Sequence, residues 1–477
     1  MGQQWDIKDL RDWDSRIREK VEAFGLSCFP QEFEICNHDQ MLSYMAYHGM
    51  PAHYPHWSFG KSYEKLKTLY NYGVSGLPYE MVINANPALA YLMHDNSLCL
   101  QILTIAHVYG HNDFFRNNFM YRDTRPEETI AYAKLRAERV RAYVEDPSIG
   151  LKKVERILDA AHALAMQTRR HTAIRKLAAD EQKDHALDAA RPPLDPFQHI
   201  HKPVEYNPPD LERLPLEPEE DILLFIAEHN PYLSEWQKDL LHMVHDETQY
   251  FLPQLETKIM NEGWASYWHH AILNSLDLPT ELHLEFLIHH NQVIQPHSGG
   301  INPYHLGFKI WHDIRRRYDE PTEDEIRHFG SPEKSGIEKL FEVRETDRDV
   351  SFLRRFLTRE LMQEMNMFEH VRDEDKRIVS RITDEGNWTD IRDTLLQNTG
   401  MAAVPVIRII DADYLRNRTL YLEHEHDGRD LEQEYMQRTL KYLYQLWGRK
   451  VILATTLRGK AVRFSHGNDG FEEYSHI

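Results

Sequence analysis

The order of apolar and polar residues predicts that most of the chain is helical. Leu10, Ile17 and Val21 recur with the spacing of one helix face, and on this pattern residues 1–48 read as helical. The pattern returns in longer runs, which predict helices over residues 97–118, 128–146, 149–187, 221–274, 279–290 and 304–317. Residues 79–84 form the best strand candidate in the first half of the chain.

The pattern changes near residue 365, where β-branched and alternating runs become frequent. Strands are predicted over residues 377–383, 404–410, 419–423, 451–455 and 461–464, with helices near 388–397 and 430–447. We therefore expect three regions. They are a mainly α-helical body over residues 1–330, a charged helical connector over residues 331–364, and a small α/β or α+β domain over residues 365–477.

A proline-rich stretch interrupts the helical body. Eight prolines lie between Pro192 and Pro218. Because proline removes a backbone donor and clashes with the preceding turn, a helix does not tolerate this density. We expect residues 192–218 to form an extended connector or a lid.

The composition excludes several classes of protein. Lys and Arg total 56 against 76 Asp and Glu, and the resulting net charge of −20 argues against nucleic-acid binding. No apolar run reaches the roughly 18 residues of a membrane span, and the first residues lack the pattern of a signal peptide. The three cysteines are too scattered for a disulfide framework or a thiolate metal site. We expect a cytoplasmic protein that does not span a membrane.

Two of the 29 histidines form the sharpest motif in the chain. His107 and His111 are four residues apart in a strongly apolar helical run, so they share one helix face with Cβ atoms about 5–6 Å apart. This spacing lets two imidazoles bind one tetrahedral ion, as in H-E-x-x-H zinc sites. Taken alone, the pair is equally well explained as two core histidines bonded to carboxylates or to the backbone.

A third ligand has to come from a distant segment. Glu262 lies in an apolar helical run between bulky aromatic residues, and a buried glutamate is rare unless it is paired or bound to a metal. The string E-G-W-A at this position is similar to the helix that supplies the third ligand in gluzincin-type metallopeptidases. We therefore predict a site for a divalent transition metal, with zinc as the expected ion, held by His107, His111 and Glu262. His269, on the same face as Glu262, is expected to support the ligands rather than to bind the ion.

One position departs from the zinc-peptidase pattern. Val108 follows the first histidine, where H-E-x-x-H enzymes have the glutamate that activates the metal-bound water. Either another carboxylate acts as the base, with Glu80 and Glu256 as the candidates, or the protein is not a peptidase. The missing glutamate is the strongest sequence argument against a protease.

Other candidate residues are weaker. His305 follows Tyr304 near the start of a predicted helix, where polar side chains often meet a substrate, although ordinary helix-start chemistry explains the pair as well. His242 and His245 have helical spacing, but their charged neighbours favour a solvated face. A di-iron carboxylate bundle is not supported, because the two Glu-x-x-His motifs that it requires are absent.

Five strings along the chain carry a family resemblance. They are GMPAHYPHWSFGK (49–61), YEMVINANPALAYLM (79–93), IAHVYGHNDFFRNN (105–118), NEGWASYWHH (261–270) and NPYHLGFKIW (302–311). In this order they resemble the SpoVR family, stage V sporulation protein R, as far as about residue 330. The C-terminal segment fits the same family in length and character.

The resemblance implies a role in forming the spore cortex, a modified peptidoglycan. It also implies partners, since members of the family occur in non-sporulating bacteria beside a PrkA-type serine kinase and a protein with a von Willebrand-like fold. It supplies no catalytic residues, so the predicted metal site rests on this sequence alone. Our first hypothesis is a metal-dependent hydrolase that acts on a peptide or amide of an envelope precursor. The alternative is a non-catalytic regulatory or scaffold protein of the kinase-linked system.

Overall fold

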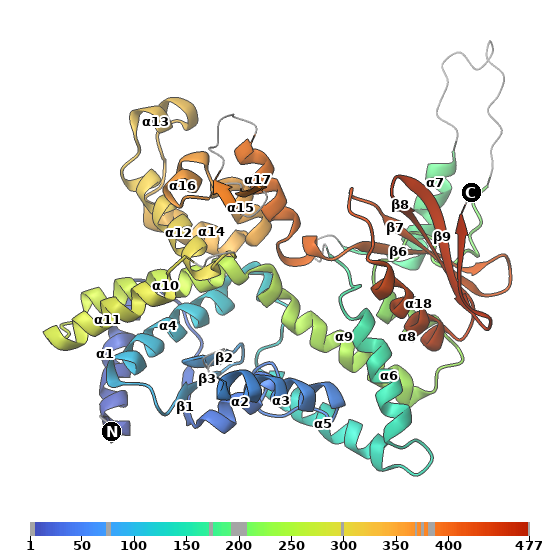
Figure 1. The fold of residues 1–477 in the computed structure, drawn as a ribbon, viewed down its shortest axis with the longest axis horizontal. Coiled ribbons are helices and arrows are strands. Elements are labelled where there is room, and N and C mark those ends of the chain that lie inside the picture. Colours follow the sequence, from blue (N-terminus) through green and yellow to red (C-terminus); the bar gives the residue numbers. More distant parts are fainter. Residues whose placement is uncertain are drawn as a thin grey trace. The chain divides into compact units, whose positions relative to one another are not determined.

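The chain forms two compact units, which are described here one at a time (Figure 1). The structure is a computed structural model that describes residues 5–72, 78–170, 175–191, 208–296, 300–367, 370–373, 376–379 and 387–475. Unit 1 comprises residues 1–141 and 249–403, and unit 2 comprises residues 142–248 and 404–477. Two of the boundaries fall inside helices, in α5 (Thr129–Glu145) and α9 (Glu235–Glu256).

Five helices form the centre of unit 1. They are α4 (Leu98–Asn117), α10 (Lys258–Ser275), α12 (Pro303–Asp319), α14 (Gly336–Thr346) and α15 (Asp349–Phe356). Helix α4 begins after Ser97, whose side chain accepts a hydrogen bond from the backbone of Leu100. Its sequence is apolar on nearly every face, and every residue from Cys99 to Phe115 is buried. Unit 1 is therefore organised around α4.

Glycines allow the central helices to approach closely. A Cβ atom on Gly110 of α4 would lie 2.6 Å from the Cα atom of Ala265 in α10. A Cβ atom on Gly263 of α10 would lie 2.4 Å from the Cα atom of Gly307 in α12. Side-chain carbons do not approach other atoms so closely, so these contacts require the smallest residues. The E-G-W-A string thus lies where α10 is packed between two other helices.

A small sheet packs against α4 in the same unit. It has the order β1-β3-β2, with β1 (Gln31–Cys36) parallel and β2 (Glu80–Ile83) antiparallel to β3 (Ala88–Met93). Strand β2 confirms the strand predicted over residues 79–84. Strand β1 shows that the helical interpretation of residues 1–48 was wrong in its middle, because QEFEIC alternates polar and apolar residues with the period of a strand.

A buried ion pair joins the central helices. Both carboxylate oxygens of Asp113 in α4 accept hydrogen bonds from Arg344 of α14 at 2.8 Å. The same carboxylate accepts hydrogen bonds from the indole of Trp264 at 2.9 Å and from the backbone of Ser27 at 2.7 Å. Asp113 therefore connects α4, α10, α14 and the segment after α1. The remaining elements of unit 1 are α1 (Ile7–Ala23), α2 (His38–Ala46), α3 (Trp57–Asn71), η1 (Phe119–Tyr121), α11 (Thr280–Val293), α13 (Glu323–Phe329), α16 (Arg359–Glu364), β4 (His370–Asp373), β5 (Lys376–Val379), α17 (Asn387–Gln397) and η2 (Gly400–Ala403).

Unit 2 is built on a mixed five-stranded sheet with the order β10-β9-β8-β7-β6. Its strands are β6 (Val406–Tyr414), β7 (Thr419–Glu425), β8 (Val451–Leu457), β9 (Lys460–Gly467) and β10 (Gly470–Ser475). Strands β7 and β8 are parallel, and α18 (Gln433–Trp447) connects them and packs on β8 and β9. Helix α6 (Leu151–Leu164) packs against α18 and against α8 (Ile222–His229), and α7 (Ala179–Ala190) completes the unit.

The structure confirms a mainly helical body and a C-terminal part with a mixed sheet. The boundaries of the two compact units differ from those of the three predicted regions. Residues 142–248 belong to the same unit as residues 404–477. Residues 192–207 of the predicted connector lie outside the described residues. The described part of the connector contains a turn and bends, and Leu214 and Glu219 pair through their backbones with Ala412 and Ile409 along the outer edge of β6.

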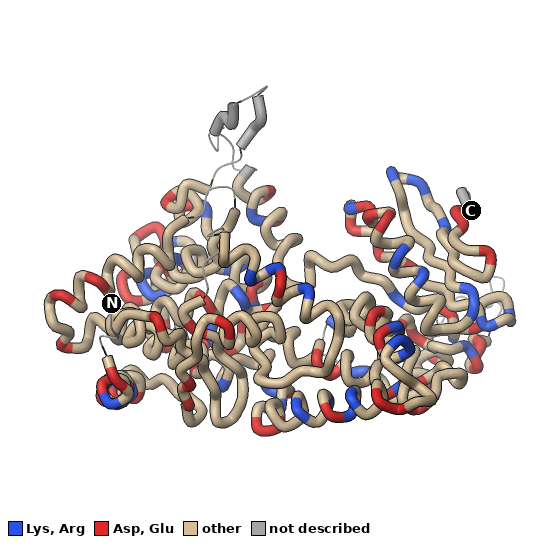
Figure 2. The backbone as a smooth tube through the Cα atoms, turned by 60° about the horizontal axis from the view of Figure 1, so that its bottom comes forward, with Lys and Arg blue, Asp and Glu red and all other residues tan. Residues whose placement is uncertain are grey.

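Two surface-related properties follow from the sequence: how charged residues are distributed, and whether any helix could cross a membrane. Acidic and basic residues are interspersed along the described backbone of each unit (Figure 2). No helix in the described part of the chain is both long and apolar enough to cross a membrane.

Candidate metal centre

His107 and His111 lie one turn apart on α4, inside the core of unit 1. Their ring centroids are 4.6 Å apart and the rings are nearly perpendicular, at 84°. Their side chains are 3% and 8% exposed. The structure thus brings the two imidazoles together out of contact with bulk water.

Glu262 of α10 faces both imidazoles. Its Oε2 atom lies 3.5 Å from Nε2 of His111 and 3.9 Å from Nε2 of His107. These distances are too long for good hydrogen bonds. Within the described chain, this buried oxygen has no hydrogen-bond partner. The three residues predicted as metal ligands therefore converge, at separations that leave a buried carboxylate oxygen unsatisfied.

Glu80 of β2 adds a second carboxylate to the cluster. Its Oε1 atom lies 3.9 Å from Nε2 of His107. The ligand atoms of Glu80, His107 and His111 all lie within 4.8 Å of one another. The side chains of Glu80 and Glu262 are 16% and 20% exposed, so solvent reaches the cluster from the side of the carboxylates.

Hydrogen bonds from the other ring nitrogens orient the two histidines. Nδ1 of His111 lies 2.9 Å from Oδ1 of Asn261, an acceptor, so this nitrogen carries the proton. Nδ1 of His107 lies 2.9 Å from Nδ1 of His269, which the sequence placed as a supporting residue. Both Nε2 atoms consequently face the carboxylates, as a metal ligand requires.

Burial and mutual charge set the ionisation of the cluster. Burial, with a smaller effect from the charge of His107, lowers the pKa of His111 to about 4, so its ring is neutral. Burial raises the pKa of Glu80 above its ordinary value, with a further contribution from Glu262. Burial also opposes the ionisation of Glu262, but His107, His111 and Tyr304 outweigh it and lower the pKa of Glu262. One carboxylate is thus held ionised beside a neutral imidazole, while the other retains a proton more easily.

Tyr304 is the residue at this site that sequence reasoning did not select. Its hydroxyl lies near enough to Glu262 for the charge of the carboxylate to act on it, and its ring centroid lies 6.1 Å from that of His107. The negative charge of Glu262, followed by burial, raises the pKa of the phenol, which stays protonated. Asn302 caps the helix by accepting a hydrogen bond from the backbone of Tyr304. The sequence marks this helix start, but it does not show which side chain of the first turn faces α4 and α10.

The other candidate catalytic residues have different partners. Nδ1 of His305 donates a hydrogen bond to the carbonyl of Ile294 at 2.8 Å, and this bond joins the start of α12 to the end of α11. The carboxylate of Glu256 accepts a hydrogen bond from Arg348 at 2.9 Å and one from the backbone of Met401 at 2.5 Å. The structure therefore brings Glu80 to the histidine pair, and it gives Glu256 and His305 contacts of their own elsewhere in unit 1.

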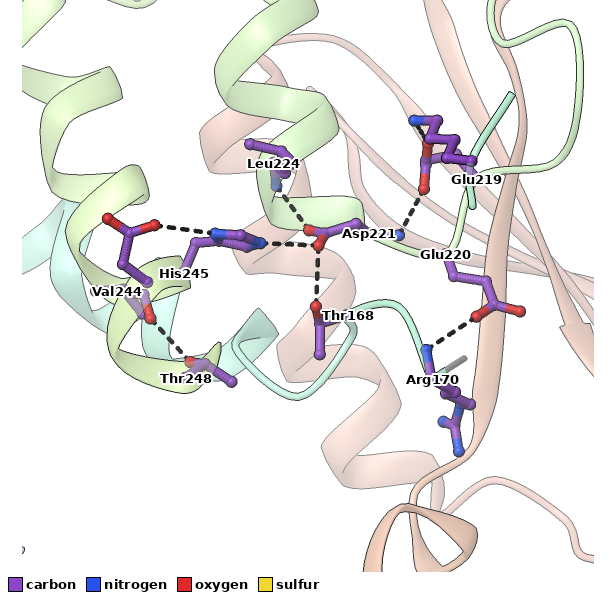
Figure 3. Close-up of polar contacts among 11 residues, drawn as sticks. Thr168, Arg170, Glu219, Glu220, Asp221, Leu224, Val244, His245 and Thr248 are labelled. Atoms are coloured by element: carbon purple, nitrogen blue, oxygen red, sulfur yellow. Dashed lines mark hydrogen bonds and ion pairs between the residues drawn. The ribbon is translucent and has the colours of Figure 1, made fainter. Parts of the chain in front are cut away.

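The sequence suggested that His245 of unit 2 lies on a solvated face, but the structure shows it largely buried. Its side chain is 15% exposed, and its Nε2 atom lies 2.9 Å from Oδ2 of Asp221 (Figure 3). The same oxygen accepts a hydrogen bond from Thr168, and the other carboxylate oxygen of Asp221 accepts one from the backbone of Leu224 at the start of α8. Asp221 therefore joins three segments of unit 2 and pairs with the charged form of His245.

The cluster in unit 1 has the donor set and the spacing of a metal site. Two donors bound at about 2.1 Å to a tetrahedral ion lie about 3.4 Å apart. The separations of 3.5 and 3.9 Å around Glu262 would shorten only slightly to reach this geometry. Neutral imidazole nitrogens combined with carboxylate oxygens suit zinc and neighbouring divalent transition metals. The residues present therefore fit the predicted ion.

These features define a class: a mainly helical protein whose first unit contains a buried cluster of two histidines and two glutamates. Residues 4–404 match the family model described as SpoVR like protein, and residues 405–458 match the SpoVR-like C-terminal domain. The chain belongs to the SpoVR family, which is associated with sporulation. The border between the two family models coincides, within one residue, with the boundary that separates Ala403 of unit 1 from Val404 of unit 2.

A relative in Escherichia coli (strain K12) carries the name "Uncharacterized protein YcgB". It is 33% identical to this chain over 476 residues, which cover 95% of this chain and 92% of the relative. No solved structure matches the chain.

Proposed function

We propose that the protein is a metal-dependent enzyme in which His107, His111 and Glu262 hold a divalent transition metal, with zinc as the expected ion. The observation that carries this proposal is the buried Oε2 atom of Glu262, which faces two Nε2 atoms without a hydrogen bond from the described chain. A buried carboxylate oxygen that accepts no hydrogen bond is unfavourable. A cation shared with two neutral imidazoles removes this penalty.

The proposed reaction is hydrolysis. The ion supplies Lewis acidity and lowers the pKa of water toward neutrality. Val108 cannot accept a proton, but Glu80 borders the ligands and burial raises its pKa toward the range of a useful general base. The hydroxyl of Tyr304 lies beside Glu262 and can donate a hydrogen bond to negative charge that develops on a substrate carbonyl.

The proposed substrate is a peptide or amide of a cell-envelope precursor. A Lewis acid, a base and a hydrogen-bond donor around one point are the set of groups that hydrolysis of an amide requires. The envelope part of the proposal comes from the association of the family with the spore cortex. Substrate would approach from the side of Glu80 and Glu262, since these side chains retain solvent contact while both histidines are buried.

The metal is tested first, by elemental analysis of the purified full-length protein. We expect about one equivalent of transition metal, and we expect His107→Ala and Glu262→Gln to lose it. His38→Ala is the matched control, because this side chain is 48% exposed and belongs to α2, away from the cluster. Wild-type protein of native fold that contains no metal, and that binds no added Zn²⁺ in calorimetry, would contradict the proposal.

The alternative function is a non-catalytic regulatory or scaffold protein that works with a PrkA-type kinase and a von Willebrand-like partner. One observation favours it: Val108 is fully buried, at the position where zinc peptidases have their base. Cells that produce His107→Ala at the wild-type level separate the two functions. An enzyme loses its cellular function in this variant, whereas a scaffold retains it.

A further inference from the structure

We infer that His269 and His290 are positioning residues that fix the proposed ligand His107 through an ordered chain of three imidazoles. The inference rests on the proposed function, because it assigns the chain of imidazoles to metal binding. It extends that function to a residue on α11, which contributes no ligand atom to the cluster.

The three rings form a continuous hydrogen-bonded line across three helices. Nδ1 of His107 on α4 lies 2.9 Å from Nδ1 of His269 on α10. Nε2 of His269 lies 2.7 Å from Nδ1 of His290 on α11. His269 is 0% exposed and His290 is 3% exposed, so water does not compete for these bonds. Both nitrogens of His269 are occupied, which leaves neither free to bind an ion.

An ion at Nε2 of His107 determines the proton position on all three rings. A neutral imidazole has one donor nitrogen and one acceptor nitrogen. When Nε2 of His107 binds an ion, its Nδ1 carries the proton and donates it to Nδ1 of His269. His269 then has its proton on Nε2 and donates to Nδ1 of His290. His290 is left with its proton on Nε2. Each hydrogen bond in the chain is thus donated in the direction from His107 to His290.

The two proposed histidine ligands are therefore oriented by different groups. His111 donates to the side-chain amide of Asn261, which needs no further partner to act as an acceptor. His107 donates to an imidazole that can accept only in one of its two neutral forms. His290 supports that form, because its Nδ1 atom can accept the hydrogen bond from the far nitrogen of His269. Loss of a group that orients a ligand typically weakens metal binding about 10–100-fold.

Two amide substitutions at His269 distinguish orientation from packing. The oxygen of Asn reaches the position of Nδ1, so His269→Asn keeps an acceptor for His107. The amide of Gln reaches the position of Nε2, so His269→Gln leaves His107 without one. We expect His269→Asn to bind Zn²⁺ within about threefold of the wild type and His269→Gln to bind it about 10–100-fold more weakly. A packing role predicts the reverse order, because Gln fills more of the space of His.

His290 provides the second pair of variants. We expect His290→Asn, which keeps the acceptor, to retain Zn²⁺ affinity, and His290→Leu to lose about tenfold or more. Affinity is measured by competition with a chromophoric chelator, with circular dichroism as the check on folding. The visible spectrum of the Co²⁺-substituted protein should change in His269→Gln and His290→Leu, because the ligand His107 reorients, and should stay as in the wild type in the two Asn variants.

The outcomes separate this inference from the proposed function. Wild-type protein that binds neither Zn²⁺ nor Co²⁺ overturns the proposed function and, with it, the role given to the three imidazoles. Wild-type protein that binds Zn²⁺, with equal affinity in His269→Gln and His290→Leu, overturns the inference alone. The expected order of affinities in both pairs supports it.

Discussion

The indole of Trp264 donates a hydrogen bond to Asp113 at 2.9 Å, and each residue lies two positions after a proposed metal ligand. Glu262 precedes Trp264 on α10, and His111 precedes Asp113 on α4. The bond therefore holds together the two helices that carry the cluster. The same carboxylate pairs with Arg344, so the ion pair and the candidate metal centre depend on one packing arrangement.

Removing Arg344 should destabilise unit 1 strongly. In Arg344→Met the carboxylate of Asp113 stays buried without its cation, and breaking a buried pair in this way typically costs about 3–5 kcal/mol. Urea-induced unfolding measures the loss. The control is Arg122→Met, since Arg122 and Glu345 are 3.8 Å apart with side chains 69% and 54% exposed, and its effect should stay below about 1 kcal/mol. Equal stability of the two variants would refute the account.

Gly263→Ala should weaken metal binding without touching a ligand. The added methyl group would lie 2.4 Å from the backbone of Gly307, so α10 has to shift away from α12 and take Glu262 with it. We expect lower Zn²⁺ affinity and a free energy of unfolding reduced by about 1–3 kcal/mol. Gly60→Ala in α3 is the control, because nothing lies within 4 Å of the added atom. A Gly263→Ala protein with unchanged affinity and stability would contradict the close packing of the two helices.

Glu80→Gln tests whether Glu80 acts as a base or as a ligand. The amide keeps the size of the side chain but neither carries a charge nor accepts a proton at neutral pH. We expect the variant to keep its metal equivalent in elemental analysis and to lose the cellular function of the protein, because the base contributes to the reaction and not to binding. Loss of the metal would instead make Glu80 a fourth ligand.

His245 should make the stability of unit 2 depend on pH. Burial alone would lower its pKa, but hydrogen bonds and charges from Asp221 and Asp246 outweigh burial and raise it to about 9. Because the pKa of His245 is higher in the folded state, its charged form stabilises the fold. This stabilisation is fully present below the pKa of the unfolded chain, near 6.5, and is lost as the pH rises through 9. We expect a loss of roughly 2 kcal/mol after allowing for solvent screening.

The pH effect is measured by hydrogen–deuterium exchange of the backbone of α8, whose start is capped by Asp221. Protection should fall between pH 6.5 and 9 in the wild type. In His245→Gln, which does not titrate, protection should be lower at pH 6.5 and should change little across the same range after correction for the intrinsic exchange rate. Identical profiles for the two proteins would show that the pair does not contribute.

Much of the candidate site could be anticipated because its signals are local. The spacing of His107 and His111, the apolar surroundings of Glu262 and the strand around Glu80 are all properties of short segments. Periodicity places each of these residues on an element, and the rarity of buried glutamate singles out Glu262. That they meet at one point is a tertiary fact, and the structure supplies it.

The remaining features have no local signal. His290 lies 21 residues from His269 and joins it only because α11 packs beside α10. Tyr304 and His305 are neighbours, and only the direction of the first turn of α12 decides which one reaches Glu262. Unit 2 combines segments on either side of residues 249–403, and a boundary search that looks for compositional change along the chain cannot find such a division. Strand β1 did have a local signal, its period of two, which the helical periods on both sides obscured.

The division of unit 2 into two segments has a consequence for synthesis on the ribosome. Helices α6 and α8 emerge early, but Val154 and Phe225 bury their side chains in a unit whose entire sheet and whose α18 are translated last. At about 5–20 residues per second, the roughly 175 residues between the end of α8 and the start of β6 take about nine to thirty-five seconds to appear. During that interval α6 lacks α18, against which it packs in the folded unit, so truncation before residue 404 should yield a product that aggregates.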